Sequence, residues 1–541
     1  MREIPLREQR LGRFILLGFL LAISLPYAFA ALVTPPGWTW GGLLFNVDDQ
    51  NVHLSWARQV QDGAFFLRDL FTTEPLITGE RPYFFNIFPL LLGWLARLTT
   101  LDVVWIYHIV RVAAAGIALW QFHLLALTVT RYEERYSRAR ILALCLIAFT
   151  TGAGFIGTLW PGYVQYFNLI DRPDGPIAMM PEAFFFLSAL IFPINIISMA
   201  LLAFIYRKVV EKQGTLPVFL AALALSNIHT YDALPLIVTV LLWLGWQFRQ
   251  GEREGLKVGT ALVVGAILPI LYQVVVFRNS EEFRVKALTQ TAAPPLLHLI
   301  ISLLPLLLFL PWTRQALREL PGARLMGLWV AVTFVMIYLP VSFARKMIEG
   351  VHLPLCLLAA LGAGVLLDRL ATSRARQGVT GAVLLVLMLS PLACLGWMGT
   401  AFLENNASRW RYNVPPAYFN EGEAGALRAL NAQKGEGAVL SSVFIGNYIP
   451  RATGKTVYLG HWAETLRFGS KLGQVLGFYG GQMSVDQARN FLKENRIRWV
   501  VESRFEQGSE QRSLPWQELG LQPVYTGGDA QTGTTSVYVM P

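Results

Sequence analysis

Two adjacent carboxylates, Asp48 and Asp49, open the polar stretch DDQNVHLSWAR directly after a long apolar segment. If residues 49–58 form a helix, Asp49, His53 and Trp56 share one face, at spacings of four and three residues. Asp48 then stands at the N-terminal end, where the helix dipole favours a negative charge. A carboxylate in this position could accept a proton from a hydroxyl group or hold a metal ion. A helix cap beside a solvated neighbour would leave the same pattern.

A second set of polar residues interrupts apolar segments further along the chain. His229 and Asp232 are three residues apart in SNIHTYDALP, where Pro235 is expected to break a helix. They could hold a hydroxyl group of a ligand or a divalent ion, or they could satisfy the broken backbone. Asp171 and Asp174 in DRPDG are weak metal candidates, because the same Pro and Gly equally mark a turn. Metal dependence stays open, with Mg or Mn as the possible cofactor and no other cofactor expected.

Composition defines the elements that must position these residues. Hydrophobic residues make up 54% of the 541 positions, charged residues only 15%, and the mean hydropathy is +0.45. These values predict a polytopic membrane protein. Apolar stretches of about 20 residues, the length that crosses a bilayer, recur from Leu11 to about Thr400. Beyond residue 400 the chain is mixed, charged and interrupted by glycines, which predicts a soluble domain.

Charge and cysteine usage exclude several classes of function. The net charge is +10, but Arg and Lys fall in short clusters between apolar segments, as topology determinants do, and not in the single stripe of a nucleic-acid binder. Cys145, Cys356 and Cys394 all lie inside apolar runs. We therefore expect no nucleic-acid partner, no disulfide framework and no cysteine zinc site.

The basic clusters predict the topology of the chain. An uncleaved first helix with a cytoplasmic N-terminus is favoured over a cleaved signal peptide, because its apolar run is long and many spans follow. Residues 83–98 are short and contain Asn86 and Pro89, so we expect a juxtamembrane or re-entrant helix there. Counting membrane crossings so that the strongly basic loops all lie on the cytoplasmic side gives about eleven spans. They are predicted near residues 11–33, 103–130, 140–160, 184–206, 216–230, 232–247, 257–277, 296–311, 324–343, 350–368 and 378–400.

This topology predicts a transmembrane domain over residues 1–400, with a first outer loop at 34–102, and an extracytoplasmic domain over 401–541. Helices and strands alternate in the latter, which predicts a small α/β domain without nucleotide-binding or hydrolase motifs. Its stretch GHWAETLRFGSK could close over the membrane site or bind an acceptor, but a solvated charged face is favoured. The residues concerned are His461, Glu464, Arg467 and Lys471.

Polar residues collect at the outer ends of the predicted spans. Arg345 and Lys346 form an outer basic pair, which the excess of basic residues on the cytoplasmic side disfavours unless the pair has a function. Both are suited to binding phosphate, and anchoring of a span is the alternative. Arg284 and Lys286 form a second, weaker pair. Single charges at a membrane boundary are common. The functional interpretation therefore rests on the presence of many polar residues on the same, outer side of the membrane.

The order of these motifs resembles a known family. FNVDDQNVHLSWARQVQDGAFFLRD after the first span, followed by RPYFFNIFPLLLGWL and IYHIVRVAAAGIALW, resembles the GT-C superfamily of integral-membrane glycosyltransferases. Later stretches, NIHTYDALPL, RKMIEGVHLPL and VYLGHWAETLRFGSK, resemble a bacterial subset of that superfamily.

The resemblance implies an α-helical polytopic membrane fold, GT-C-like with about 11–13 transmembrane helices, and a small C-terminal α/β extracytoplasmic domain. It implies inverting transfer of a sugar from a polyprenyl-phosphate-linked donor to an extracytoplasmic glycan, lipid or protein acceptor. The chain would lie in the cytoplasmic (inner) membrane of a bacterium, among membrane lipid, with its active site outside.

The resemblance also implies roles for individual residues. Asp48 matches the first member of the family's acidic pair, but position 49 is Asp where many members have Glu, so either carboxylate could be the base. The remaining assignments are donor-phosphate binding and substrate lining. The phosphate set is Arg345, Lys346 and His352, and the lining set is His53, Glu182, His229, Asp232 and Glu349.

A polytopic transporter or flippase for a lipid-linked glycan is the rival class. Transporters usually contain internal repeats and matched broken spans, and no such symmetry is visible here. Ionisable residues also avoid the centres of the predicted spans, whereas a permeation path would place some near the midplane. A sensor or scaffold that displays the C-terminal domain would not require the acidic pair.

Overall fold

The computed structural model describes residues 4–43, 46–153, 180–370, 372–404, 416–506, 516–529 and 531–540. The chain forms two compact units, each assembled from separate segments. The first unit comprises Met1–Pro26, His108–Val275 and Gln290–Trp397, and the second comprises Tyr27–Tyr107, Val276–Thr289 and Met398–Pro541.

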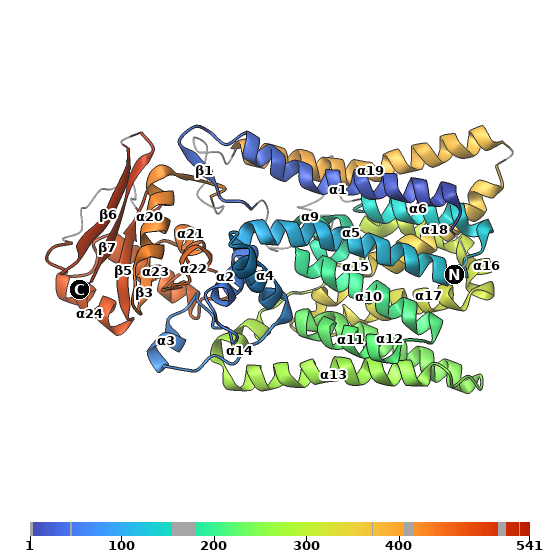
Figure 1. Ribbon diagram of the computed structural model, residues 1–541, viewed down its shortest axis with the longest axis horizontal. Helices are drawn as coiled ribbons and strands as arrows, with labels where there is room; N and C mark the ends of the chain where they lie inside the picture. The colour runs from blue at the N-terminus through green and yellow to red at the C-terminus, as the bar shows by residue number, and fades with distance from the viewer. Residues whose placement is uncertain are drawn as a thin grey trace. The chain divides into compact units, whose positions relative to one another are not determined.

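The first unit is helical throughout its described residues (Figure 1). Apolar residues dominate its sequence, and a helix satisfies every backbone polar group within the segment, as a lipid environment requires. Four of its helices, α1, α5, α13 and α19, continue into residues of the second unit. The α-helices are α1 (Leu6–Leu32), α5 (Val103–Val129), α6 (Ser137–Phe149), α9 (Phe185–Ile191), α10 (Pro193–Glu211), α11 (Thr215–Ile228), α12 (Thr230–Arg249), α13 (Leu256–Asn279), α15 (Leu296–Leu307), α16 (Arg314–Glu319), α17 (Pro321–Met336), α18 (His352–Asp368) and α19 (Ser373–Glu404). The 3₁₀ turns are η1 (Glu134–Tyr136), η3 (Pro181–Ala183), η4 (Leu310–Thr313) and η5 (Ala344–Ile348).

Each of the eleven predicted spans contains a helix, but not all are long enough to cross a membrane. Seven helices of the described chain meet the length and hydropathy of a span, and the bent pair Leu296–Leu307 and Leu310–Glu319 would make eight. The helices α6, α11 and α17 have 13, 14 and 16 residues, which is short of the roughly 20 that a straight crossing needs. The chain is an α-helical polytopic membrane protein.

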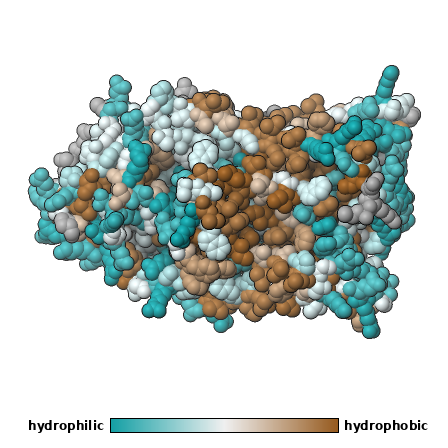
Figure 2. All heavy atoms as spheres, in the orientation of Figure 1, coloured by the Kyte–Doolittle hydropathy of each residue, from teal (hydrophilic) through white to brown (hydrophobic). Residues whose placement is uncertain are grey.

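The outer surface of the first unit's helices is apolar. Leu241 on α12, Leu271 on α13 and Leu385 on α19 are 51%, 57% and 64% exposed. Figure 2 shows such hydrophobic side chains gathered in broad patches on the molecule's surface. Exposed apolar area on this scale is what contact with lipid chains requires.

The second unit combines short helices with two sheets. Its first-loop elements are β1 (Trp38–Trp40), α2 (Val47–Gln61), α3 (Glu74–Thr78) and α4 (Ile87–Thr99), and α14 (Glu281–Leu288) comes from the segment between α13 and α15. The C-terminal elements are β2 (Tyr418–Asn420), α20 (Glu421–Ala432), β3 (Ala438–Leu440), α21 (Val443–Gly446), α22 (Ile449–Thr453), β4 (Thr456–Val457), α23 (Phe468–Tyr479), α24 (Val485–Glu494), β5 (Ile497–Glu502), β6 (Gln522–Asp529) and β7 (Gly533–Val539).

The C-terminal segment has the predicted α/β character. Its five-stranded sheet has the order β4-β3-β5-β7-β6, in which β3 pairs parallel with both β4 and β5, and β7 pairs antiparallel with β5 and β6. A buried apolar cluster that includes Leu440, Phe478, Leu492 and Val500 packs around this sheet. Burial of such side chains is the main source of stability for a domain of this size.

The first loop and the C-terminal segment fold together, which the division at residue 400 did not anticipate. Strands β1 and β2 pair antiparallel, with Trp38 opposite Asn420. The backbone N–H of Val457 donates to the carbonyl of Leu70 at 2.8 Å, which joins β4 to the loop. Long-range strand pairing of this kind leaves no local signal in the sequence.

Helix α2, which carries the acidic pair, is held from two sides. On one side α4 approaches closely, because a side chain at Gly93 would lie 2.4 Å from Cβ of Val60. On the other side Asn51 donates its side-chain amide to Asn447 at 2.5 Å, and Arg58 donates to the carbonyl of Ala452 at 2.9 Å. The residues predicted as a juxtamembrane or re-entrant helix are thus α4, which supports α2.

Candidate functional site

The acidic pair lies in the first turn of α2, as the spacing predicted. Asn46 caps this helix in the left-handed region, at φ 49°, a conformation that Asn adopts more readily than most residues. The side chains of Asp48 and Asp49 are 29% and 53% exposed, so a substrate can reach both carboxylates.

His461 of the C-terminal segment is the partner of this pair. Its Nε2 lies 3.2 Å from Oδ1 of Asp49 and 3.8 Å from Oδ2 of Asp48. Its Nδ1 accepts hydrogen bonds from the backbone N–H groups of Ala463 at 3.1 Å and Glu464 at 3.3 Å. Since Nδ1 is the acceptor, Nε2 carries the hydrogen and donates it to Asp49. The backbone around His461 therefore fixes the tautomer and orients the ring.

The two carboxylates differ in their electrostatic environment. Burial raises the pKa of Asp48, and the adjacent charge of Asp49 raises it further. Burial opposes protonation of His461, but the hydrogen bond to Asp49 and the charges of Asp49, Glu464 and Asp48 outweigh it, so the pKa of His461 is raised. Asp48 therefore binds a proton more tightly than an ordinary aspartate does, which suits a proton acceptor.

A second group of charges lies beside the His461 turn. Lys286 of α14 pairs with Glu464, and its ammonium group lies 4.8 Å from the ring centre of Trp56 on α2. Asp69 is 3% exposed in the same unit. Burial and the charge of Glu464 raise the pKa of Asp69 well above its usual range. Lys286, a weaker phosphate candidate by sequence, is thus held by a carboxylate of the C-terminal segment.

The prediction of a solvated charged face over residues 461–471 is wrong for three of its four residues. His461, Glu464 and Lys471 are 1%, 4% and 4% exposed, because each has a polar partner within the second unit. Lys471 binds Glu74 of α3 at 2.7 Å. Only Arg467 is largely exposed, and it too reaches Glu74, at 2.5 Å. A charged residue at helical spacing is buried when its partner comes from another segment, which the spacing cannot reveal.

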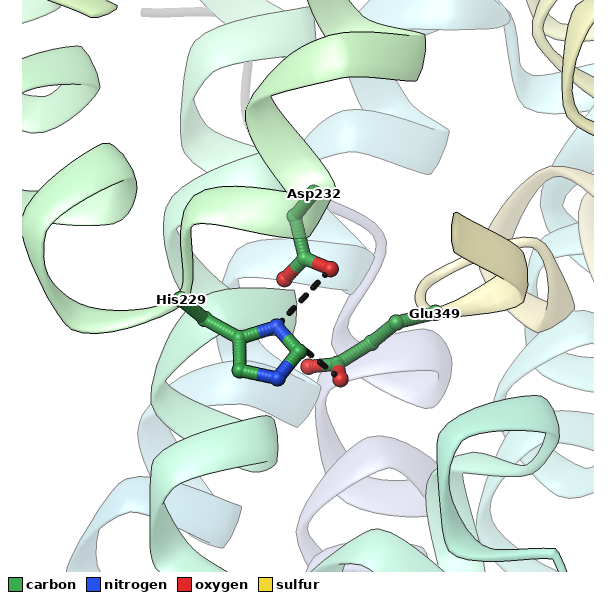
Figure 3. Close-up of side chains that lie close together, drawn as sticks. All are labelled: His229, Asp232 and Glu349. Atoms are coloured by element: carbon green, nitrogen blue, oxygen red, sulfur yellow. Dashed lines mark ion pairs between the residues drawn. The ribbon is translucent and has the colours of Figure 1, made fainter. Parts of the chain in front are cut away.

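The predicted outer residues of the first unit include a second cluster. Figure 3 shows His229, Asp232 and Glu349 turned toward one another. Nδ1 of His229 lies 3.0 Å from Asp232 and 3.4 Å from Glu349. The interruption between α11 and α12 falls at His229 itself, whereas Pro235 is accommodated inside α12.

The predicted phosphate ligands lie on the turn that precedes Glu349. Arg345 and Lys346 belong to η5, and an Arg345 nitrogen is 3.8 Å from Glu182. The ammonium group of Lys346 lies 4.9 Å from the ring centre of Tyr231, the residue before Asp232. Both cations therefore stand beside polar or aromatic groups of the first unit, at the N-terminal end of the candidate span Ala344–Asp368.

Two further predicted site residues contact neighbouring helices. His352 is fully buried, with its Nδ1 3.3 Å from the backbone N–H of Phe185 and its Nε2 3.4 Å from Oγ1 of Thr150. His53 packs its ring 5.8 Å from Phe88, in the contact between α2 and α4. We do not include either in the site. The metal candidates Asp171 and Asp174 lie outside the described residues.

The structure thus places the predicted residues in two groups, one in each unit. Asp48 and Asp49 meet His461 in the second unit. The other group lies in the first unit and comprises Glu182, His229, Asp232, Arg345, Lys346 and Glu349. Sequence reasoning did not predict His461 as the partner of the acidic pair; the available signal was the polar stretch GHWAETLRFGSK, for which closure over the membrane site was only the less favoured alternative.

Comparison with known proteins supports the fold. No family model and no curated protein matches this sequence. Among solved structures, the chain is similar to ArnT from Cupriavidus metallidurans bound to undecaprenyl phosphate, with 12% identity, a TM-score of 0.54 and coverage of 97% of both chains. It is also similar to the arabinofuranosyltransferase AftD from mycobacteria, with 12% identity and a TM-score of 0.52, over 96% of this chain and 40% of that one. The chain therefore shares the fold of the ArnT and AftD structures.

Proposed function

We propose that this protein is a membrane glycosyltransferase that transfers a sugar from a polyprenyl-phosphate-linked donor to a hydroxyl group of an extracytoplasmic glycan, lipid or protein acceptor, with inversion at the anomeric carbon. The observation that carries the proposal is the Asp48–Asp49 pair at the start of α2, oriented by His461, in a chain with a GT-C fold. The solved ArnT structure is described as bound to undecaprenyl phosphate, which favours a lipid phosphate as the leaving group here.

Asp48 is the proposed general base. The acceptor atom attacks the anomeric carbon while its proton passes to the Asp48 carboxylate, and the bond between that carbon and the phosphate oxygen breaks. Attack from the face opposite the phosphate inverts the anomeric configuration. His461 acts through Asp49, because its hydrogen bond holds that carboxylate beside Asp48. It is therefore a positioning residue in this scheme.

Arg345 and Lys346 are the proposed ligands of the donor phosphate. Displacement leaves a polyprenyl phosphate whose charge needs cationic partners, and guanidinium and ammonium groups supply charge-assisted hydrogen bonds. Their position at a helix end suits a lipid whose phosphate lies at the level of the headgroups.

The proposed location is the cytoplasmic membrane of a bacterium, with the acidic pair and the C-terminal segment on the extracytoplasmic side. The basic loops between spans favour this orientation under the positive-inside rule. Impermeant cysteine labelling at position 49 and at a C-terminal position of intact cells tests it, and both positions should react.

The test of the function is a transfer assay with purified protein in detergent and a labelled polyprenyl-phosphate sugar. Asp48→Asn preserves shape and removes the charge, so turnover should fall by about 10²–10⁴ while donor binding survives. The matched control is Asp62→Asn at the other end of α2, where the side chain is 48% exposed and pairs with Arg58. That variant should transfer sugar at the parent rate.

The outcomes distinguish the competing explanations. A larger loss in Asp49→Asn than in Asp48→Asn would move the base by one residue. Parent turnover in both variants and in the double variant would exclude the acidic pair as the catalytic centre. Transfer in detergent also separates an enzyme from a flippase, because detergent micelles have no two compartments between which a lipid could move.

A further inference from the structure

The cluster formed by His229, Asp232 and Glu349 brings two buried carboxylates against one imidazole. Asp232 and Glu349 are each 3% exposed, and their carboxylate side chains are fully covered. With both carboxylates ionised, the single imidazole between them could balance at most one of the two negative charges. Burying an ionised group without a partner costs several kcal/mol, on the order that would unfold a small domain.

Hydrogen bonds do not satisfy this cluster. Nδ1 of His229, both carboxylate oxygens of Asp232 and both of Glu349 are buried, and none of these five atoms has a hydrogen-bond partner within the described chain. The contacts of 3.0 and 3.4 Å from Nδ1 are short enough for ion pairs but are not aligned as hydrogen bonds. Buried polar atoms are nearly always paired, so a common partner for all three side chains is indicated.

The ligand atoms have the spacing of a metal coordination shell. One atom from each side chain lies within 4.8 Å of the others, and the two contacts at Nδ1 are 3.0 and 3.4 Å. In a tetrahedral shell with bonds of about 2.0–2.2 Å, neighbouring ligand atoms are about 3.3–3.6 Å apart. The three side chains converge on one point in Figure 3, so a small ion needs little rearrangement to bind there.

Backbone features fix the three ligands on different elements. His229 lies at the junction of α11 and α12, with φ −143° and ψ 85°, and Asp232 follows in the first turn of α12. Glu349 ends η5 and is followed by Gly350 at φ +79°, where a side chain would come within 2.6 Å of Leu202. The chain can reverse after Glu349 only because residue 350 is glycine.

We propose that His229, Asp232 and Glu349 bind one divalent transition-metal ion. An imidazole with two carboxylates favours Zn²⁺ or Mn²⁺ over Mg²⁺, which prefers oxygen ligands alone and retains its waters. Three protein ligands leave a coordination position for water or a substrate oxygen. The ion would tie α12 to the turn that carries Arg345 and Lys346, and this inference does not depend on the proposed sugar transfer.

The experiment measures metal binding directly. Protein purified without a histidine tag is stripped with a chelator and titrated with Zn²⁺, Mn²⁺ or Mg²⁺, and bound metal is counted by mass spectrometry after equilibrium dialysis. The parent should bind about one Zn²⁺ and prefer it to Mg²⁺. Loss of an outer-sphere group typically weakens metal affinity 10–100-fold, so loss of a ligand in Asp232→Asn or Glu349→Gln should cost at least about 100-fold.

Asp368→Asn is the matched control, because Asp368 ends α18 in the same unit, is 64% exposed and pairs with Arg138 at 2.6 Å. It should bind zinc as the parent does. X-ray absorption of the zinc-loaded parent, which needs no variant to fold, should show one imidazole nitrogen and carboxylate oxygens. Failure of the stripped parent to bind zinc, zinc binding that survives both ligand variants, or a shell without imidazole would each overturn the proposal.

Discussion

Two buried acidic clusters of the first unit differ in how their charges are met. Glu8 and Arg140 are both fully buried, and each Glu8 oxygen accepts two hydrogen bonds at 2.7–2.9 Å. The donors are Arg140, His123 and Ser137. Around His229, by contrast, four carboxylate oxygens have no hydrogen-bond partner within the described chain.

This difference in hydrogen bonding distinguishes a buried carboxylate that stabilises the fold from one that is available to a ligand. A carboxylate whose lone pairs are all occupied by donors of its own chain has no capacity left for a ligand. One whose oxygens are buried and unsatisfied has been held in that state by the surrounding fold, at a cost that a ligand can offset. Glu8 therefore serves stability, and the His229 cluster serves binding.

The largest expected effect follows from removing the counter-charge of Glu8. Arg140→Met should destabilise the protein by about 3–5 kcal/mol, because it leaves a buried carboxylate unpaired. Asp232→Asn in metal-free protein should cost far less, since it removes charge from a cluster that lacks compensation. Denaturant unfolding in detergent measures both.

A double variant tests the reason for this loss. Glu8→Leu combined with Arg140→Met replaces the pair by apolar side chains and should recover most of the stability. Equal destabilisation by Arg140→Met and Asp232→Asn would remove the distinction between the two clusters.

The next effect concerns the cations beside the unsatisfied cluster. Replacing Arg345 and Lys346 together by Gln should weaken binding of a polyprenyl phosphate by about 2–4 kcal/mol, since charged hydrogen bonds are each worth about 1.5–3. Arg138→Gln, an exposed arginine of the same unit, is the control. Unchanged affinity for the lipid phosphate in a folded double variant would leave the two residues as membrane anchors.

Glu74 of the second unit is, like Glu8, a carboxylate that accepts hydrogen bonds from donors of its own chain. Its contribution to the stability of the protein should therefore depend on pH. Burial opposes ionisation of Glu74, but hydrogen bonds from Lys471, Thr72 and Arg467 lower its pKa to about 2. Because this folded value is below the unfolded value of about 4.5, Glu74 stabilises the protein above pH 4.5 and loses that contribution as the pH falls toward 2. The loss should be on the order of 2–3 kcal/mol.

Unfolding measured between pH 6 and pH 3 checks this linkage. The stability of Glu74→Gln should depend less on pH in that window than the parent's does. Asp486→Asn, whose side chain is 86% exposed, should retain the parent's dependence. A parent and a Glu74→Gln variant with the same pH dependence would show that saturation of Glu74 does not stabilise the fold.

The smallest effect tests His461 as a positioning residue. His461→Ala removes the donor to Asp49 and should lower turnover about tenfold, close to the value of one hydrogen bond to a charged group. Without that N–H the pKa of Asp48 should rise further, so the acid limb of the pH–rate profile should move to higher pH. His461→Gln retains a donor and should recover part of the rate. Loss of rate with no shift of the limb and no rescue would mean that His461 only fills space.

Much of the fold was predictable because its signals are local. Long apolar runs predicted helices at all eleven predicted spans. The spacing within residues 49–58 indicated a helix with Asp48 at its N-terminal end, and α2 covers this range. The alternation of elements after residue 416 likewise predicted an α/β segment. Helix formation and strand propensity depend on neighbours within a few residues, so composition and spacing suffice.

The site was predictable only in part, because its residues depend on partners that are distant in sequence. His461 is 412 residues from the Asp49 that it contacts, and Glu464 is 178 residues from Lys286. Their helical spacing predicted that these C-terminal side chains are solvated, because spacing contains no information about a partner from another segment. The same limit applies to Glu8, whose donors on α5 and α6 lie more than a hundred residues away.

The sequence by itself determined that this chain crosses a membrane repeatedly, that an acidic pair opens its first long loop, and that a mixed α/β segment follows the last span. These properties follow from hydropathy, charge and short-range periodicity. Only the tertiary structure decided which charges are buried, which are satisfied and which converge. Each of these outcomes depends on desolvation and on contacts between segments far apart in the chain, and neither is encoded in any single stretch.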